Sequence, residues 1–295
     1  MIGTLYLLLW VFAVLGLSLA APSGFHKTEN AVPPPEKLIL GGYPATQKQF
    51  PFQVYLHVTD YTGRPFRCGG TLLTPRHVLT AAHCVYNQNL QESYVAAGMA
   101  TLRDLETTEG VQIRQLHAAY IHHEYDNRGF NNSGQLRNDI ALVVLMQEFV
   151  LDDFVNTVQI KADDSQLLTT THYGTAVGFG ISKIIGNGIF LPGDDLLWAY
   201  DPLVSKDVCQ KRWEYLWEEQ ICAGGVHVGT AKGDSGGPLL ITEDDKYYQV
   251  GITSFGPYLP REALSQNENP SVFTRVAAYC DFLERGTSME FKCIR

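Results

Sequence analysis

Residues 233–238 read GDSGGP, and three glycines and one proline around a serine indicate a special backbone path. Glycine accepts positive φ values and lets a second backbone come close, and proline stops the turn from continuing as a helix. On such a loop the hydroxyl of Ser235 would point outward, and the N–H groups of Gly233 and Ser235 could converge on one oxyanion. The stretch therefore has the layout of a nucleophile loop, with an ordinary glycine-rich surface turn as the alternative.

The positions of the histidines separate two kinds of serine nucleophile. A serine needs a base, which is usually histidine, and the G-x-S-x-G elbow of α/β-hydrolases requires that histidine after the serine. The last histidine of this chain is His227, upstream of Ser235, which excludes the elbow. Residues 79–84 read LTAAHC and residues 138–142 read NDIAL, so the chain order is His83, Asp139, Ser235.

With ILGG at residues 39–42 and CGGTL at residues 68–72, this order resembles the chymotrypsin/trypsin family of secreted serine endopeptidases, which are made as zymogens. The resemblance covers residues 39–283. It implies an all-β fold of two six-stranded antiparallel Greek-key barrels, with the active site between them and a C-terminal helix. It also makes His83 the general base, Asp139 its orienting acid and Ser235 the nucleophile, with Gly233 and Ser235 as the oxyanion hole.

The composition is typical of a globular protein that does not bind nucleic acid. The chain is 45% hydrophobic and 18% charged, enough to bury a full core, and its net charge of −9 argues against nucleic acid as a partner. Six cysteines in a secretory chain indicate disulfides, in connectivities that spacing alone leaves open. The resemblance implies Cys68–Cys84 and Cys209–Cys222, which leaves Cys280 and Cys293 to pair with each other.

The ends of the chain carry processing signals. Residues 5–19 are almost unbroken apolar sequence followed by small residues, which predicts a signal peptide over residues 1–20 and a secreted, extracellular protein. The run is shorter than the ~20 residues that span a membrane, so no membrane association is expected after its removal. Residues 21–38 include three consecutive prolines and predict an exposed activation propeptide. The catalytic domain then covers residues 39–283, followed by a tail over residues 284–295.

Short β-branched and aromatic runs, broken by Gly, Asn and Pro, favour antiparallel β structure from residue 53 onward. One helix is expected over residues 276–283, and a second short helical region over residues 213–219. Examples of the predicted strands are residues 52–58, 78–81, 140–145, 175–177, 247–252 and 271–276.

The position of Asp234, next to Ser235, suggests how the enzyme is activated. A carboxylate buried beside the nucleophile needs a partner charge, because leaving it unpaired is strongly unfavourable. The resemblance implies that this partner is the new α-ammonium of Ile39, formed by cleavage of the Leu38–Ile39 bond. A solvated aspartate is the alternative. Because Leu38 rather than Arg or Lys precedes that bond, an activating protease of apolar specificity is expected.

The resemblance also outlines a substrate pocket. It places Gly229 at the base, Thr230 on the wall, Gly256 at the mouth and Ser271 opposite, while Ser254 supports the buried aspartate and opens the substrate-pairing segment. None of these residues is acidic, so a buried Lys or Arg of the substrate would lack a counter-charge. We therefore expect a chymotrypsin/elastase-like preference for Leu, Phe, Tyr or Met before the scissile bond, with medium aliphatic residues favoured over aromatic ones.

The remaining expectations concern modification and partners. Residues 131–133 read NNS, which is a glycosylation sequon at Asn131. No pattern of metal ligands occurs in the sequence, so we expect neither a metal nor a cofactor. Expected partners are protein or peptide substrates and serine protease inhibitors. The alternative function is a catalytically silent homologue that acts as a secreted binding protein, although none of the three triad residues is replaced.

Overall fold

The computed structural model describes residues 39–103, 105–129, 135–186 and 188–295. The predicted signal peptide and propeptide, residues 1–38, therefore lie outside the described residues, as does Asn131. Among the residues that are described, no helix is long and apolar enough to cross a membrane.

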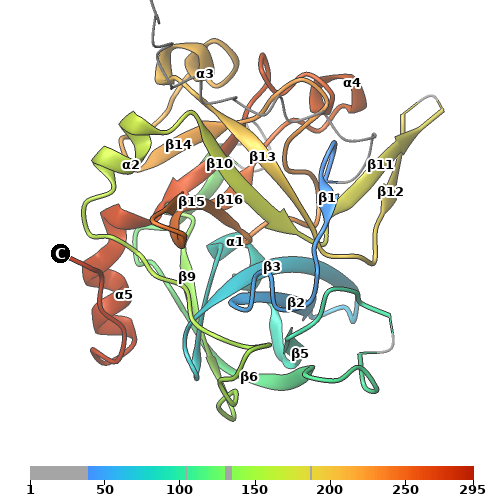
Figure 1. Cartoon of the computed structure of the whole chain (residues 1–295), viewed down its shortest axis with the longest axis vertical. Coiled ribbons are helices and arrows are strands. Elements are labelled where there is room, and N and C mark those ends of the chain that lie inside the picture. The colour runs from blue at the N-terminus through green and yellow to red at the C-terminus, as the bar shows by residue number, and fades with distance from the viewer. Residues whose placement is uncertain (1–38, 104, 130–134, 187) are drawn as a thin grey trace, which may run out of the picture. The chain divides into compact units, whose positions relative to one another are not determined.

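The first barrel, drawn from blue to green in Figure 1, is a closed ring of six antiparallel strands in the order β2-β3-β4-β9-β6-β5. Alternate side chains of each strand point into the barrel. In β2, for example, Val54, Leu56 and Val58 are all fully buried. The strands are β2 Gln53–Thr59, β3 Pro65–Thr74, β4 His77–Thr80, β5 Asn89–Ala97, β6 Gln112–Ile121 and β9 Ala141–Leu145.

The second barrel is also closed and antiparallel. Its order is β13-β10-β15-β16-β17-β14, a further β13–β14 pairing completes the ring, and β1 adds at the edge of β13. Its core contains Ala176, Leu197, Leu239, Val250 and Phe273. The strands are β1 Tyr43–Pro44, β10 Tyr173–Gly178, β13 Leu197–Val204, β14 Gln220–Ala223, β15 Pro238–Glu243, β16 Lys246–Phe255 and β17 Ser271–Arg275. Two six-stranded antiparallel barrels are thus confirmed.

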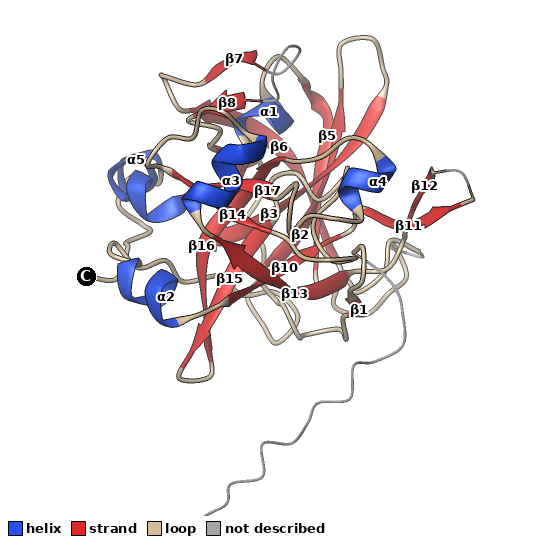
Figure 2. Cartoon of the chain, turned by 90° about the horizontal axis from the view of Figure 1, so that it is seen from above, coloured by secondary structure: helices blue, strands red, loops and turns tan. Residues whose placement is uncertain are grey.

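Short helices lie outside the strands of both barrels (Figure 2). The expected C-terminal helix is present as a 3-10 turn, Val276–Tyr279, followed by α5. The helices are α1 Ala82–Val85, α2 Ser165–Thr170, α3 Lys206–Arg212, α4 Pro260–Ala263 and α5 Cys280–Gly286. Two further pairs of strands lie outside the barrels. They are β7 Asp126–Gly129 with β8 Gln135–Arg137, and β11 Ile181–Ile185 with β12 Ile189–Pro192.

The helix expected over residues 213–219 is wrong, because α3 lies before this region and ends at Arg212. Trp213 instead has an extended backbone, and its indole N–H donates a 2.8 Å hydrogen bond to the Pro270 carbonyl. Its ring also packs edge-on against Phe255 at 5.2 Å between centroids. These tertiary contacts outweigh the local helical preference of the segment.

Three disulfides join the elements, in the pairings expected from the sequence. Cys68–Cys84 links β3 to α1, and Cys209–Cys222 links α3 to β14. Cys280–Cys293 holds the C-terminal tail against α5, where Glu284 and Arg295 form an ion pair at 2.9 Å. The tail is therefore fixed to the body of the protein by a covalent and an ionic contact.

Candidate active site

His83 and Asp139 form a hydrogen-bonded pair on the first barrel. Because β4 pairs with β9, with Thr80 opposite Ala141, the helix that follows one strand meets the loop that precedes the other. His83 Nδ1 lies 2.7 Å from Asp139 Oδ2, and the His83 backbone N–H donates to Oδ1 at 2.9 Å. When Nδ1 carries the proton donated to the carboxylate, Nε2 is the ring nitrogen with the chemistry of a proton acceptor.

The Asp139 carboxylate is only 1% exposed, and the second barrel helps to hold it. Ser254 of β16 donates its hydroxyl to Oδ2 at 2.6 Å. Thr274 of β17 donates its hydroxyl to the Asp139 backbone carbonyl at 3.0 Å. The Ser254 bond is charge-assisted and offsets part of the unfavourable desolvation of the buried carboxylate, while the Thr274 bond holds the backbone of Asp139.

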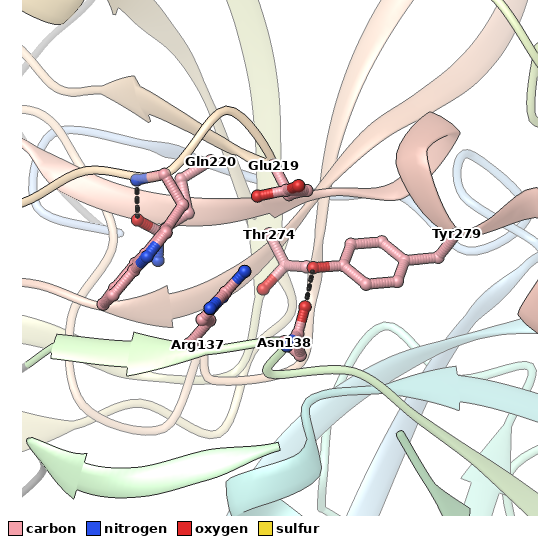
Figure 3. Close-up of a pocket in the computed structure, with 7 residues that line it drawn as sticks. Arg137, Asn138, Glu219, Gln220, Thr274 and Tyr279 are labelled. Carbon is pink, nitrogen blue, oxygen red and sulfur yellow. Dashed lines mark hydrogen bonds between the residues drawn. The ribbon is translucent and has the colours of Figure 1, made fainter. Parts of the chain in front are cut away.

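Asn138 fixes the backbone just before Asp139. Its φ of 51° lies in the left-handed region, which asparagine tolerates better than most residues. Its side chain accepts from the Tyr279 hydroxyl and donates to the Glu124 carbonyl, both at 2.9 Å. Figure 3 shows the Tyr279–Asn138 bond in a narrow crevice, which Thr274 also lines. This crevice is part of the support behind the acid and contains no residue of the predicted pocket.

The loop that carries Ser235 is hydrogen-bonded to strands of both barrels, β3 of the first and β16 of the second. The Gly69 N–H donates to the Ser235 carbonyl at 2.7 Å, and the Gly236 N–H donates to the Thr253 backbone carbonyl at 2.8 Å. Gly236 has a φ of 81°, and a Cβ there would lie 2.2 Å from Thr80 Oγ1. Only glycine fits both the conformation and the space, which explains the glycine that follows the serine.

The Cys68–Cys84 disulfide lies close to both Ser235 and His83. Cys84 Sγ is 3.6 Å from the Ser235 carbonyl oxygen and 3.8 Å from His83 Nε2. The three residues of the predicted triad therefore lie close together in space, although they come from three separate parts of the chain.

Gly233 and Ser235 offer two backbone donors beside the serine. Neither N–H donates to an acceptor within the described part of the chain. Gly233 has a φ of 100°, and a Cβ there would lie 2.9 Å from Gly180 Cα. The loop therefore requires glycine at residue 233 and leaves both N–H groups available for an anion.

Asp234 is buried beneath this loop. Its carboxylate accepts hydrogen bonds from the backbone N–H groups of Gly180, at 2.8 Å, and Ala231, at 2.9 Å. Burial nevertheless raises the pKa of Asp234 to about 7, because two neutral donors offset only part of the lost hydration.

Asp201 is a second buried carboxylate near Asp234, and sequence reasoning missed it. Burial, together with the Asp234 charge, raises the pKa of Asp201 to about 7. Neither of its carboxylate oxygens has a hydrogen-bond partner among the residues that the structure describes. The one sequence signal is an aspartate at an inward position of a strand, between Ala199 and Leu203, where an apolar residue is expected.

The segment that begins at Ile39 lies against the loop before Ser235. Ile39 is 1% exposed and packs in the core of the second barrel. Leu40 pairs with Gly229, whose N–H donates to the Leu40 carbonyl at 3.2 Å. The φ of Ile39 is 42°, which is unfavourable for a β-branched residue.

The predicted pocket residues converge around a residue that was not predicted, Gln266. Its Nε2 donates to the Thr230 carbonyl, and its Oε1 accepts from the Ser271 hydroxyl, both at 2.8 Å. A Cβ on Gly229 would lie 2.1 Å from that Oε1, and one on Gly256 would lie 2.6 Å from Ser271 Oγ. Nothing in the sequence marks Gln266, because a glutamine in a polar loop is ordinarily exposed.

Comparisons with known proteins agree with this geometry. A family model described as Trypsin matches residues 39–283. The chain is 34% identical to chymotrypsin-C of Bos taurus, over 84% of this chain and 88% of that protein. It is 32% identical to CLIP domain-containing serine protease B10 of Anopheles gambiae, over 85% and 69% respectively. With chymotrypsin of Phaedon cochleariae it shares 30% identity, over 93% and 95%.

Proposed function

Because this chain belongs to the trypsin family and is a serine-type endopeptidase, we propose that Ser235, His83 and Asp139 perform its chemistry. Ser235 Oγ attacks the carbonyl carbon of the scissile peptide, and His83 Nε2 takes the hydroxyl proton. His83 then gives that proton to the leaving amine, which leaves an acyl group on Ser235. Water, deprotonated by the same imidazole, hydrolyses the acyl-enzyme and restores the serine. Asp139 orients the imidazole and stabilises its charged form throughout.

The N–H groups of Gly233 and Ser235 stabilise the oxyanion that forms in each half of this reaction. They favour the transition state because they are fixed by the loop before any charge develops. Their lack of another acceptor in the described residues is consistent with that role.

The observation that carries this proposal is the 2.7 Å contact between His83 Nδ1 and the buried Asp139 carboxylate. The test is labelling of the chain, processed between Leu38 and Ile39, with a serine-reactive phosphonate, followed by mass spectrometry. We expect one adduct on Ser235 and none in the Ser235→Ala variant. A correctly processed, folded chain that takes no label would support a silent binding protein instead.

Specificity for apolar residues before the scissile bond is the second part of the proposal. It is supported by the absence of an acidic side chain at Gly229, Thr230, Gly256 and Ser271, which line the region around Gln266. Two of the compared relatives are chymotrypsins by name, which also favours this preference. A peptide library should show cleavage after Leu, Met, Phe or Tyr, and efficient cleavage after Arg would contradict it.

Activation by cleavage of the Leu38–Ile39 bond is the third part. The strained φ of Ile39 supports it, because that torsion includes the Leu38 carbonyl carbon and ceases to exist when the bond is cut. The raised pKa of Asp234 supports it as well, because a nearby α-ammonium would stabilise the ionised carboxylate. Both features favour the cleaved chain.

Secretion completes the proposal. The apolar run over residues 5–19 is typical of a signal peptide, and three disulfides favour an oxidising compartment. Protein or peptide substrates follow from the family, and serine protease inhibitors are proposed as partners that would occupy the same site.

A further inference from the structure

Gln266 lies between α4 and β17, and its side chain is fixed at both ends of the amide. The residue is 0% exposed. Nε2 donates to Thr230 on one side, and Oε1 accepts from Ser271 on the other, each at 2.8 Å. Moving the amide would leave buried polar groups unpaired, which is unfavourable. The side chain is therefore a fixed part of the structure.

The backbone around Gln266 is anchored as firmly. The Gln266 N–H donates to the Gly225 carbonyl at 2.9 Å, and the His227 N–H donates to the Leu264 carbonyl at 2.8 Å. Between these bonds, Val226 and Ser265 form an antiparallel bridge. The segment before Gln266 thus runs alongside the segment that leads to Gly229.

Two glycines make room for Gln266. Gly224 and Gly229 both have φ values of 148°, in the range that favours glycine. A Cβ on Gly224 would lie 2.5 Å from Gln266 Cβ, and one on Gly229 would lie 2.1 Å from Gln266 Oε1. The amide therefore occupies the space that a side chain of residue 229 would fill.

We propose that Gln266 forms the floor of the substrate pocket and limits its depth, so that the enzyme prefers Leu or Met to Phe or Tyr before the scissile bond. The inference rests on the proposed function, because it assumes that Gly229, Thr230 and Ser271 line the pocket of an active protease. The amide and the Ser271 hydroxyl fill the volume that an aromatic ring would need. A flexible aliphatic side chain stops above them, and the neutral amide gives no counter-charge to Lys or Arg.

The test compares wild-type protein with Gln266→Ala, Gln266→Asn and Gln266→Met, each carrying an enteropeptidase recognition sequence directly before Ile39. The matched control is Asn267→Ala, since Asn267 is the neighbouring amide and is exposed. The measured quantity is the ratio of kcat/KM for two peptides that differ only in Leu or Phe before the scissile bond. Phosphonate labelling of Ser235 gives the concentration of active sites.

We expect Gln266→Ala to lower the Leu:Phe ratio by about tenfold or more, because it opens space for the ring. Gln266→Asn withdraws the amide by one methylene and should lower the ratio less. Gln266→Met has a similar volume and should keep the ratio near that of wild type, as should Asn267→Ala. If the alanine variant does not fold, the asparagine variant decides the question.

Two results separate the inference from its premise. A normally labelled Gln266→Ala or Gln266→Asn protein with the wild-type Leu:Phe ratio would overturn the inference and leave the proposed function standing. A processed wild-type chain that takes no label and cleaves neither peptide would overturn the proposed function, and the inference with it.

Discussion

The Ser254 hydroxyl lies 2.6 Å from Asp139 Oδ2, the same oxygen that lies 2.7 Å from His83 Nδ1. His83 and Asp139 belong to the first barrel, and Ser254 belongs to β16 of the second. One carboxylate oxygen is therefore a hydrogen-bonded junction between the two barrels. The orientation of the imidazole depends on how the barrels are packed, as well as on its own loop.

Ser254→Ala should lower kcat by about tenfold, with a smaller effect on KM. The variant removes a hydrogen bond to a charged group, and such bonds contribute about 1.5–3 kcal/mol. We expect the effect mainly on kcat, because without this bond Asp139 would orient the His83 imidazole and stabilise its charged form less well. Steady-state kinetics on an apolar peptide measure it, with the exposed Ser165→Ala as control. An unchanged kcat would show that the junction is structural only.

Ser235→Ala, His83→Ala and the double variant should lose similar amounts of activity, each by about 10⁴-fold or more. A nucleophile and its base act as a unit, so removing the second group costs little once the first is gone. Single-turnover hydrolysis of an activated ester is the most sensitive measurement. Losses that multiply in the double variant would mean that the two residues act independently.

The pair of buried acids predicts how stability depends on pH. Burial raises the pKa of Asp201 and of Asp234 from 3.8 to about 7 in the uncleaved fold, so the folded chain keeps protons that the unfolded chain releases. The free energy of unfolding should therefore fall as pH rises from about 4 to about 7. Below about pH 4 both states hold these protons, and this source of pH dependence disappears.

Asp201→Asn removes one of these titrations while keeping the side-chain shape. In the uncleaved Ser235→Ala background it should raise the free energy of unfolding at pH 8 by about 2 kcal/mol or more, and have less effect at pH 4. Urea unfolding at both pH values measures this, with the exposed Glu148→Gln as control. Equal effects at the two pH values would contradict a raised pKa at Asp201.

The sequence predicts those parts of the proposed site whose residue types follow from local chemistry. Short sequence motifs mark the three predicted residues, His83, Asp139 and Ser235. Their neighbours are chosen by local geometry: residue 236, for example, must be glycine because a Cβ there would clash with Thr80 Oγ1. Gln266 could not be predicted, because its role depends on how a loop docks on residues that are distant in the chain. The same limit applied to the helix expected over residues 213–219, because Trp213 at its start has an extended backbone and contacts residues that are distant in the chain.

The exact bond that is cut before Ile39 determines where the new α-ammonium lies. Trypsin cleaves after Lys or Arg, so in this chain it would cut after Lys37 and leave Leu38 as the N-terminus. One extra residue adds about 3.3 Å of extended chain. Ile39 is already fully packed in the core, so a preceding residue would displace the α-ammonium from the buried Asp234 carboxylate. Without that ion pair, the loop that presents the Gly233 and Ser235 N–H groups would be held less firmly.

We therefore expect trypsin to cut the wild-type chain without producing activity, and chymotrypsin to produce Ile39 at the N-terminus together with full phosphonate labelling of Ser235. The matched control is Leu38→Arg, in which trypsin produces Ile39 directly and should activate fully. N-terminal sequencing and labelling are measured on the same samples. Full labelling of a chain that still begins at Leu38 would show that the ammonium need not reach Asp234, because the extra residue would then be harmless. Activation of the Leu38→Arg variant alone by trypsin would instead establish that the position of the new N-terminus controls the oxyanion hole.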